Sequence, residues 1–331
     1  MLVINQNQPN VAITINGMPS ILLNNNINSI SLIENRGFDA DTLQIVINDS
    51  DGLIELPNRD AEIQIAIGFG INLINKGKFI VDSVMHSGPP DIITIGAHSA
   101  DFKKELLERK SLLFENKTIQ EIVETIAKKH KLESKVAEIY QKIKIKEKSQ
   151  ANESDANLLT RIAEEYDAIA TIKNGTLLFL ERGAGKTASG ESLDTITHNR
   201  SDGDQHNYTV SDRDQYTGVE VRFLLSDKAK RQTLIVGEDR RPFKIRKIYN
   251  NEKEAKTAAD QQFKRLKRSL ASVSVNLARG NAELSAESPL KLVGFKTEMD
   301  NHNWIVTTIT HRIDASNGFV SELQAEVKPK E

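Results

Sequence analysis

Four side chains with metal-binding chemistry lie close together in this chain, namely His198, Asp202, Asp204 and His206. Imidazole nitrogens and carboxylate oxygens are common ligands of divalent cations. However, the intervening Ser201-Asp202-Gly203-Asp204 sequence is typical of a turn, and polar residues beside exposed strand ends need no ligand to explain them. We therefore interpret the cluster as a turn and predict no metal-ligating residue.

Two loops resemble ligand-binding motifs only in part. Gly183-Ala184-Gly185-Lys186-Thr187 ends like a phosphate-binding loop, but Leu180 stands where that motif requires its first glycine. Asn48-Asp49-Ser50-Asp51-Gly52 begins like a calcium loop, but Leu53 occupies a ligand position. We interpret the first as the loop that leaves a hairpin and the second as a turn, and we predict no cofactor.

Pairs of acidic residues make glycoside hydrolysis an alternative to weigh. The pairs are Glu164-Glu165, Asp49 with Asp51, and Asp39 with Asp41. This chemistry requires two carboxyl groups held across a cleft, and nothing in the sequence ties these pairs to one pocket. The chain also lacks the Gly-x-Ser-x-Gly and His-Glu-x-x-His motifs. We predict no catalytic residue and no enzyme; a peptidoglycan assay would test the alternative.

A dense basic run occurs at Lys264, Arg265, Lys267 and Arg268. At helical spacing the neighbouring apolar residues take the buried face, so we expect these cations on the solvated face near the negative end of the helix dipole. A helix that reads DNA would need a broader basic surface and a helix-turn-helix partner. We therefore predict no nucleic-acid specificity.

Composition is that of an ordinary soluble protein long enough for two or three domains. The 331 residues carry a net charge of −2 and contain no cysteine, which excludes disulfides and a cysteine nucleophile. The N-terminal residues have neither the basic region nor the apolar stretch of a signal peptide, and no apolar run is long enough to span a bilayer. We expect synthesis in the cytoplasm and no stable membrane insertion.

The alternation of apolar residues divides the chain into three predicted domains. Residues 1–105 read as antiparallel strands, including 42–48, 62–69 and 91–98, separated by turns. Residues 106–192 read as a small α/β domain with a helix after Thr118, a second helix after Ser154, and a hairpin at Asn174-Gly175. Asp and Glu outnumber Lys and Arg by 13 to 8 in residues 1–110, so the acidic bias is local to the first domain.

Residues 193–331 read as a second strand-rich domain that contains one long helix. A strand at 216–225 precedes an expected exposed loop at 226–233, and the helix is predicted from about 252 to 270. The last predicted strands are 272–277 paired with 282–286 across the Arg279-Gly280-Asn281 turn, then 304–312 and 319–327. The predicted fold class is α+β, mainly β, with two barrel domains around the small α/β domain.

Several segments resemble one protein family in the same order along nearly the whole chain. The segment from Gln150 to Glu164, with its Glu-Ser-Asp and Arg-Ile-Ala-Glu, and the following Gly-x-Leu-Leu-Phe-Leu from Gly175 resemble hub proteins of contractile phage tails. The Asn-Arg-Gly-Phe turn at 35–38, the Ser-Ala-Asp-Phe at 99–102 and the segments 198–208 and 303–327 are similar to the late control gene D family of temperate phages.

This resemblance implies a structural baseplate hub in the tail of a virion, with no enzymatic role. It implies a homotrimer in which two tube-type antiparallel β-barrel domains per subunit form a ring of six similar units. Such a ring joins the six-fold tail tube to the three-fold central spike and contacts the tape-measure protein and other baseplate proteins. The alternatives left open are the hub of a phage-derived contractile injection system and a hub with wall-hydrolase activity.

The implied ring gives one further expectation about the first domain. Its strands should lie against the tube axis, with much of its acidic excess facing the lumen or a neighbouring subunit. Closing strand-rich domains into a ring also covers strand edges that would otherwise be exposed.

Overall fold

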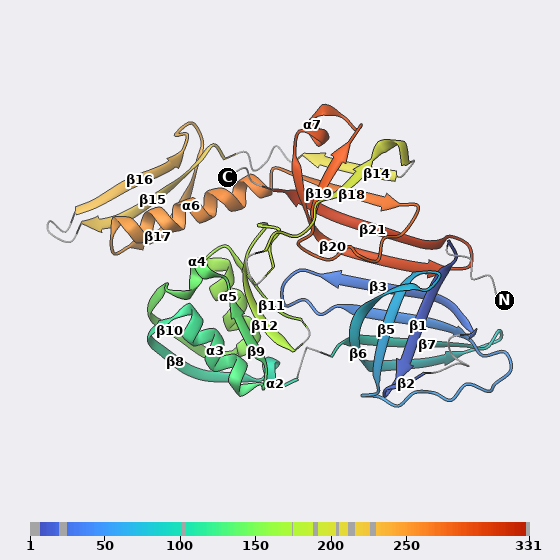
Figure 1. Ribbon diagram of the computed structural model, residues 1–331. Helices are drawn as coiled ribbons and strands as arrows, with labels where there is room; N and C mark the ends of the chain where they lie inside the picture. The colour runs from blue at the N-terminus through green and yellow to red at the C-terminus, as the bar shows by residue number, and fades with distance from the viewer. Residues whose placement is uncertain are drawn as a thin grey trace.

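The computed structural model describes residues 7–19, 25–100, 104–173, 175–187, 191–202, 205–210, 216–225 and 230–328. Its buried apolar side chains form four separate clusters. Each cluster is centred on one unit, and the first also includes Ala282 and Phe319 from the second strand-rich unit. Figure 1 shows the first strand-rich unit at the lower right, the helical unit at the lower left, the second strand-rich unit above and a projecting arm at the upper left. The predicted mainly β class is confirmed.

The first strand-rich unit is an antiparallel sheet with the strand order β3-β4-β7-β6-β5-β1-β2. Ile45 of β4 lies opposite Ile95 of β7, and both are fully buried, as the alternating pattern predicted. In Figure 1 β1 and β5 cross the direction of β3 and β7. Buried apolar residues from all four strands belong to one cluster. The strands are β1 (Pro9–Ile15), β2 (Met18–Pro19), β3 (Ile27–Asn35), β4 (Thr42–Asn48), β5 (Glu62–Phe69), β6 (Asn72–Ser87) and β7 (Ile92–Ser99).

The second strand-rich unit continues this same sheet. Its strand β20 pairs antiparallel with β3, from Asn35 opposite Thr308 to Ser29 opposite Asp314. The order then runs β20-β21-β18-β14, with β19 and β13 on a branch from β20. The elements are β13 (Ile196–Asn199), a 3-10 turn η1 (Arg200–Asp202), β14 (Gln205–Val210), β18 (Ala271–Leu277), β19 (Pro289–Val293), α7 (Thr297–Asp300), β20 (Asn303–Asp314) and β21 (Gly318–Val327).

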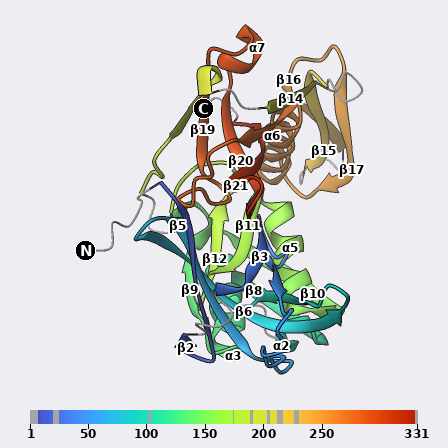
Figure 2. The same ribbon diagram turned by 90° about the vertical axis from the view of Figure 1, so that its right-hand side faces the viewer.

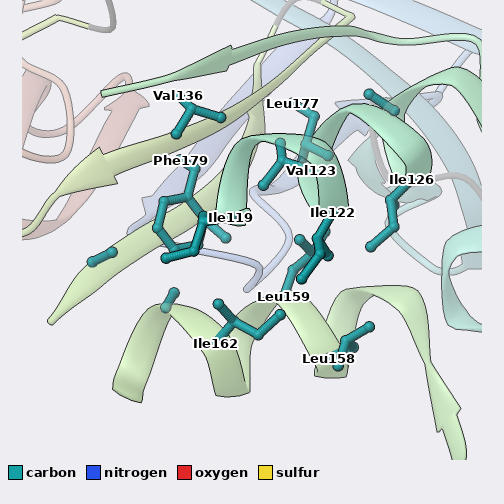
Figure 3. Packing of buried hydrophobic residues seen from close by; sticks show 14 of the residues in the cluster. Ile119, Ile122, Val123, Ile126, Val136, Leu158, Leu159, Ile162, Leu177 and Phe179 are labelled. Carbon is teal, nitrogen blue, oxygen red and sulfur yellow. The ribbon is translucent and has the colours of Figure 1, made fainter. Parts of the chain in front are cut away.

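The helical unit packs two capped helices against a small sheet (Figure 3). Thr118 and Ser154 cap their helices as predicted, since the Thr118 side chain accepts from Glu121 N and the Ser154 side chain accepts from Asn157 N. The hairpin is confirmed, with Gly175 at φ 73°; Asn174 lies outside the described residues. The elements are α2 (Lys104–Leu107), β8 (Arg109–Thr118), α3 (Ile119–Lys129), β9 (Glu133–Val136), α4 (Glu138–Gln141), β10 (Lys144–Ser154), α5 (Asp155–Glu165), β11 (Ala168–Lys173) and β12 (Thr176–Glu181).

The arm is a three-stranded sheet with the order β16-β15-β17 and one helix on one face. It comprises β15 (Gly218–Leu225), β16 (Lys230–Gly237), β17 (Pro242–Tyr249) and α6 (Glu252–Arg268). The predicted helix is confirmed, with Asn251 as its N-cap and with Ala255 and Ala259 fully buried against the sheet.

Two predictions about the last third of the chain are wrong. Residues 230–233 begin strand β16 and are not loop, while 226–229 lie outside the described residues. Residues 282–286 form turns and not a strand, because β18 is already paired on both edges, with β14 and β21. Leu284 is nevertheless fully buried, which explains why this segment has the apolar pattern of a strand.

Within the described ranges, no helix is both long enough and apolar enough to cross a bilayer.

Candidate functional site: buried charges where the four units meet

Six charged side chains meet where the four units come together, and we call this set the central junction. Its members are Arg36 from the first strand-rich unit, Asp167 and Arg182 from the helical unit, Arg268 from the arm, and Glu287 and Glu326 from the second strand-rich unit. Three guanidinium groups therefore face three carboxylates. Opposite charges in equal number are what such a buried site requires, because an unpaired buried charge is very costly.

Glu326 joins two of the three arginines of the junction. Its Oε1 lies 2.6 Å from Arg36 Nη1 and 3.7 Å from Arg268 Nε. Arg36 also pairs with Glu287, and Arg268 also pairs with Asp167. The Arg268 side chain is only 3% exposed, although it ends a helix whose neighbouring cations are solvated. The prediction that Arg268 lies on the solvated face is therefore wrong, whereas Lys264, Arg265 and Lys267 are exposed as predicted.

Glu287 is held by Arg36 on one side and by the loop after β12 on the other. Gly183 N donates to its Oε2 at 2.8 Å, so the loop after β12 binds a carboxylate of its own chain. Leu193 N donates a hydrogen bond to Gly185 O at 2.8 Å. Gly183 and Gly185 have positive φ angles of 70° and 63°. This confirms the interpretation of the loop as a hairpin exit. Glu287 itself has φ 72°, a strained value for a residue other than glycine, which the surrounding contacts must maintain.

Burial controls the acid–base properties of the junction. Burial raises the pKa of the Asp167 carboxyl despite the nearby Arg268 and Arg182, and it raises the pKa of the Glu287 carboxyl despite Arg36 and the Gly183 N–H. Burial and the neighbouring Arg36 and Arg268 lower the pKa of Arg182. The junction is thus a desolvated charge cluster whose members depend on one another.

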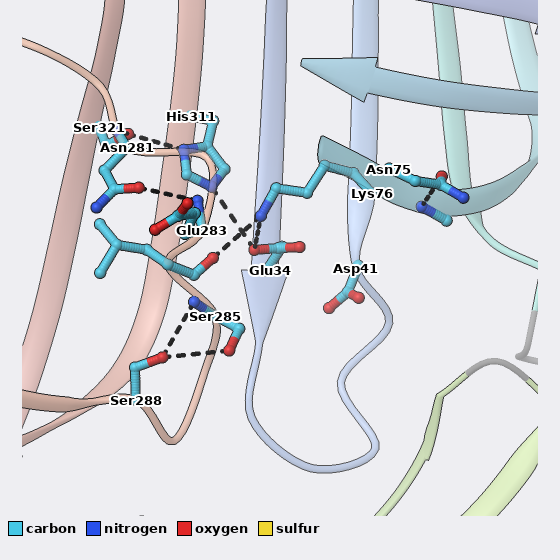
Figure 4. A network of polar contacts seen from close by, with 12 residues as sticks. Glu34, Asp41, Asn75, Lys76, Asn281, Glu283, Ser285, Ser288, His311 and Ser321 are labelled. Atoms are coloured by element: carbon cyan, nitrogen blue, oxygen red, sulfur yellow. Dashed lines mark hydrogen bonds and ion pairs between the residues drawn. The ribbon is translucent and has the colours of Figure 1, made fainter. Parts of the chain in front are cut away.

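A second network crosses the seam between β3 and β20 (Figure 4). Lys76 Nζ donates to Glu34 Oε2 and to Leu284 O, each at 3.0 Å, and the lysine side chain is 5% exposed. His311 Nε2 lies 3.6 Å from the same Glu34 oxygen, and its Nδ1 lies 2.8 Å from Ser321 Oγ. Burial raises the pKa of Glu34, but contacts with His311 and Lys76 outweigh it and leave the pKa lowered.

Asp155 is the centre of a third network, within the helical unit. The residue is fully buried at the start of α5, with its Oδ2 lying 2.7 Å from His130 Nε2 and 3.0 Å from Lys129 Nζ. Its Oδ1 accepts from Gln150 Nε2 at 2.9 Å, and Lys110 Nζ is 3.5 Å from Oδ2. Burial alone would raise the Asp155 pKa, but hydrogen bonds from Gln150, His130 and Lys129 lower it to about 2. The Glu-Ser-Asp motif therefore combines a helix cap with a buried anion.

Of the four metal-type residues of the sequence, the structure describes the side chains of the two histidines. His198 and His206 both lie against Phe295, with ring centroids 6.0 and 5.0 Å apart. Asp202 is in η1, and Asp204 lies outside the described residues. In the described part of the chain, no group of three or more His, Cys, Asp or Glu side chains could hold a metal ion.

The acidic pairs face separate partners. Glu165 pairs with Lys148, and Asp41 pairs with Lys173. Asp49 Oδ1 accepts from Ile54 N at 3.0 Å, which closes the turn that the sequence predicted there. What the structure brings together instead is the set of junction residues. Arg36 lies in the Asn-Arg-Gly-Phe turn, Arg268 in the basic run and Glu326 in the family-like segment 303–327, but none was predicted as a site residue. No sequence signal indicated that the six junction residues meet.

Comparisons with known proteins agree with one another. A family described as "Phage tail baseplate hub (GPD)" matches residues 91–317. The chain is 36% identical to the probable baseplate hub protein of Escherichia phage P2, over 91% of this chain and 88% of the relative. Its fold is similar to a tail protein from Neisseria meningitidis, with a TM-score of 0.70, 14% identity and 96% of each chain covered.

A second similar structure is a component of a secretion system. It is an Escherichia coli protein described as a component of the type VI secretion system with structural similarity to bacteriophage T4 tail proteins. The TM-score is 0.62 at 13% identity, with 96% of this chain and 77% of that chain covered. At such low identity this comparison speaks for the fold alone.

Removing Arg268 should destabilise the protein far more than removing its neighbour. Arg268→Ala leaves Asp167 and Glu326 buried without this cation, so the free energy of unfolding should fall by roughly 3–5 kcal/mol. Lys267→Ala, one residue away and exposed, removes only a cation–π contact with Phe263 and should change it by less than about 1 kcal/mol. Urea denaturation of both variants measures this difference, and equal losses would contradict the role of the junction.

Asp155 should make stability depend on acid. Its pKa is lowered from 3.8 to about 2, so its stabilising contribution is complete above about pH 4 and is lost as the pH falls toward 2. That loss is up to roughly 2 kcal/mol. Asp155→Asn should be less stable than wild type at neutral pH and should lose less stability between pH 4 and 2. Asp51→Asn, at an exposed position, serves as the control. If Asp155→Asn lost as much stability between pH 4 and 2 as the wild type, Asp155 would not be the source of the acid dependence.

Proposed function

The chain belongs to the phage tail baseplate hub family, and on that basis we propose that it acts as a homotrimer linking the six-fold tail tube to the three-fold central spike. Its role as a baseplate hub is structural, and it is not an enzyme. Baseplate hubs are components of the virion tail. We infer synthesis in the cytoplasm of the bacterial host before incorporation into the tail.

The pairing of β3 with β20 carries this proposal. It joins the two strand-rich units edge to edge, so that one continuous sheet runs through both. Two strand-rich units joined side by side are what a three-subunit ring needs in order to present six similar units. Three copies then match six-fold symmetry on one face and three-fold symmetry on the other.

The domain division follows from the same proposal. We assign residues 1–105 to the first tube-type barrel, 106–192 to the α/β domain and 193–331 to the second barrel domain with its helix. The separate apolar clusters of the first strand-rich unit and the helical unit support the first boundary. The proposed ring architecture leads us to expect that the first barrel lies against the tube axis.

The proposed partners are the central spike protein, the tail tube protein, the tape-measure protein in the lumen and other baseplate proteins. A structure with a similar fold is a Francisella PdpA–VgrG complex, with a TM-score of 0.53 at 10% identity, of which this chain covers 59%. Together with the secretion-system component, it supports one alternative, the hub of a phage-derived contractile injection system. Electron microscopy of particles from the native host distinguishes the two, because an infectious phage has a DNA-filled head.

The mass of the purified protein in solution tests the proposed assembly. Light scattering of the full chain, alone and mixed with its spike protein, should give three copies per particle in at least one sample. A three-fold spike requires three equivalent contacts, so a 1:1 ratio of hub to spike subunits is expected. A monomer in both samples, with no complex, would contradict the proposal.

A further inference from the structure

The loop between β4 and β5 displays apolar and acidic side chains to solvent in a defined conformation. Asp49 is buried and accepts from Ile54 N at 3.0 Å, and Gly52 N donates to Asp49 O at 2.8 Å. Ile54 packs against the core of the first strand-rich unit. These anchors hold Leu53 and Leu56 outward, 68% and 53% exposed.

Acidic side chains flank these leucines. Asp51 and Glu55 are both exposed on the same loop. Single exposed leucines are ordinary, but two of them on an anchored loop form a candidate contact surface. We call residues 51–56 the acidic loop.

The outer face of the arm sheet has the complementary chemistry. The helix α6 covers the face formed by Val219, Val221 and Phe223. The opposite face, which we call the outer face, carries Arg222 and Leu224 on β15, where Arg222 lies opposite Thr233 and Ile248 and Leu224 lies opposite Arg231. Arg222 and Arg231 are exposed, and Leu224 is 39% exposed.

Charge on the outer face is unbalanced. On β15 its acid, Glu220, is already paired with Lys244 Nζ at 3.0 Å. Residues 218–268 as a whole contain 15 of the 44 Lys and Arg residues but only 7 of the 46 Asp and Glu residues. This basic excess contrasts with the acidic excess of residues 1–110, and such complementary fields favour association between copies.

The two surfaces lie at opposite ends of the molecule. In Figure 1 the arm is at the upper left and the first strand-rich unit is at the lower right, and the view turned by 90° also separates them (Figure 2). One copy therefore cannot join its own loop to its own arm. A contact between different surfaces of successive copies is heterologous, and such contacts close into a ring when the rotation between copies allows it.

We propose that the acidic loop of one subunit docks on the outer face of the arm of a second copy. Asp51 and Glu55 would face Arg222 and Arg231, while Leu53 and Leu56 pack beside Leu224. This inference rests on the proposed homotrimer and names the surfaces that hold it together. Other occupants of the outer face, such as an acidic baseplate protein, are outcomes of the test below.

Charge reversal tests the contact in the full-length protein. Asp51→Lys with Glu55→Lys, and separately Arg222→Glu with Arg231→Glu, should each weaken self-association at least about tenfold, and combining all four should restore it. Lys253→Glu with Lys256→Glu is the matched control, because both lysines are exposed on α6 and the change in net charge equals that of the arginine reversal. Sedimentation velocity measures association, and circular dichroism confirms folding.

Disulfide cross-linking gives a second readout. The chain has no cysteine, so any disulfide must form between the introduced residues. Leu53→Cys with Leu224→Cys in one chain should give covalent oligomers of up to three copies on oxidation. Leu53→Cys with Leu113→Cys should not, although Leu113 on β8 is also 53% exposed.

The outcomes separate this contact from the proposed trimer. A trimer that neither reversal weakens and that does not cross-link would overturn the contact and leave the proposed trimer intact. A monomer that also fails to cross-link would overturn both. Weakening by the arginine reversal alone, without restoration by the combination, would assign the outer face to a different acidic partner and overturn the docking of the loop.

Discussion

The antiparallel pairing of β3 with β20 is the constraint on which the rest of this architecture depends. It brings together segments near the two ends of the chain, with Asn35 opposite Thr308. Ordering so large a loop costs conformational entropy, which local contacts cannot offset. The offset comes from the two apolar clusters on either side of the seam and from the backbone hydrogen bonds across it. Without this pairing the two strand-rich units would each expose an edge.

Buried charge gives the seam its specificity. Apolar packing tolerates small rotations of one unit against another, whereas the central junction is satisfied only when residues from all four units are in place. Arg36, Arg268 and Glu326 come from three different units, and Glu326 contacts both arginines directly. A buried charge cluster adds little net stability compared with apolar packing, but it makes wrong arrangements costly. For a protein that belongs to a family of tail hubs, a fixed orientation of its units is the property that assembly requires.

Local signals in the sequence predicted the local structure. Thr118, Ser154 and Asn251 cap helices where their positions indicated, and the alternating strands of the first domain are present. The non-local contacts could not be predicted, because alternation specifies which face of a strand is buried and not which strand lies beside it. The sequence pattern does not distinguish Arg268 from the solvated cations beside it on the same helix. Its burial is explained by its ion pair with Asp167, a residue distant in sequence. The family was predictable because short motifs such as Asn-Arg-Gly-Phe at 35–38 can be recognised in the sequence without knowledge of the distant partners of Arg36.

The central claim is that each chain supplies two side-by-side segments of a ring around the tail axis. Electron cryo-microscopy of the intact tail, at a resolution that traces strands, tests it most directly. The account predicts three copies at the baseplate, with both strand-rich units of each copy in one ring below the tube and the β3–β20 seam preserved. A density map that places the first strand-rich unit outside the ring, or that shows six copies in it, would contradict the account.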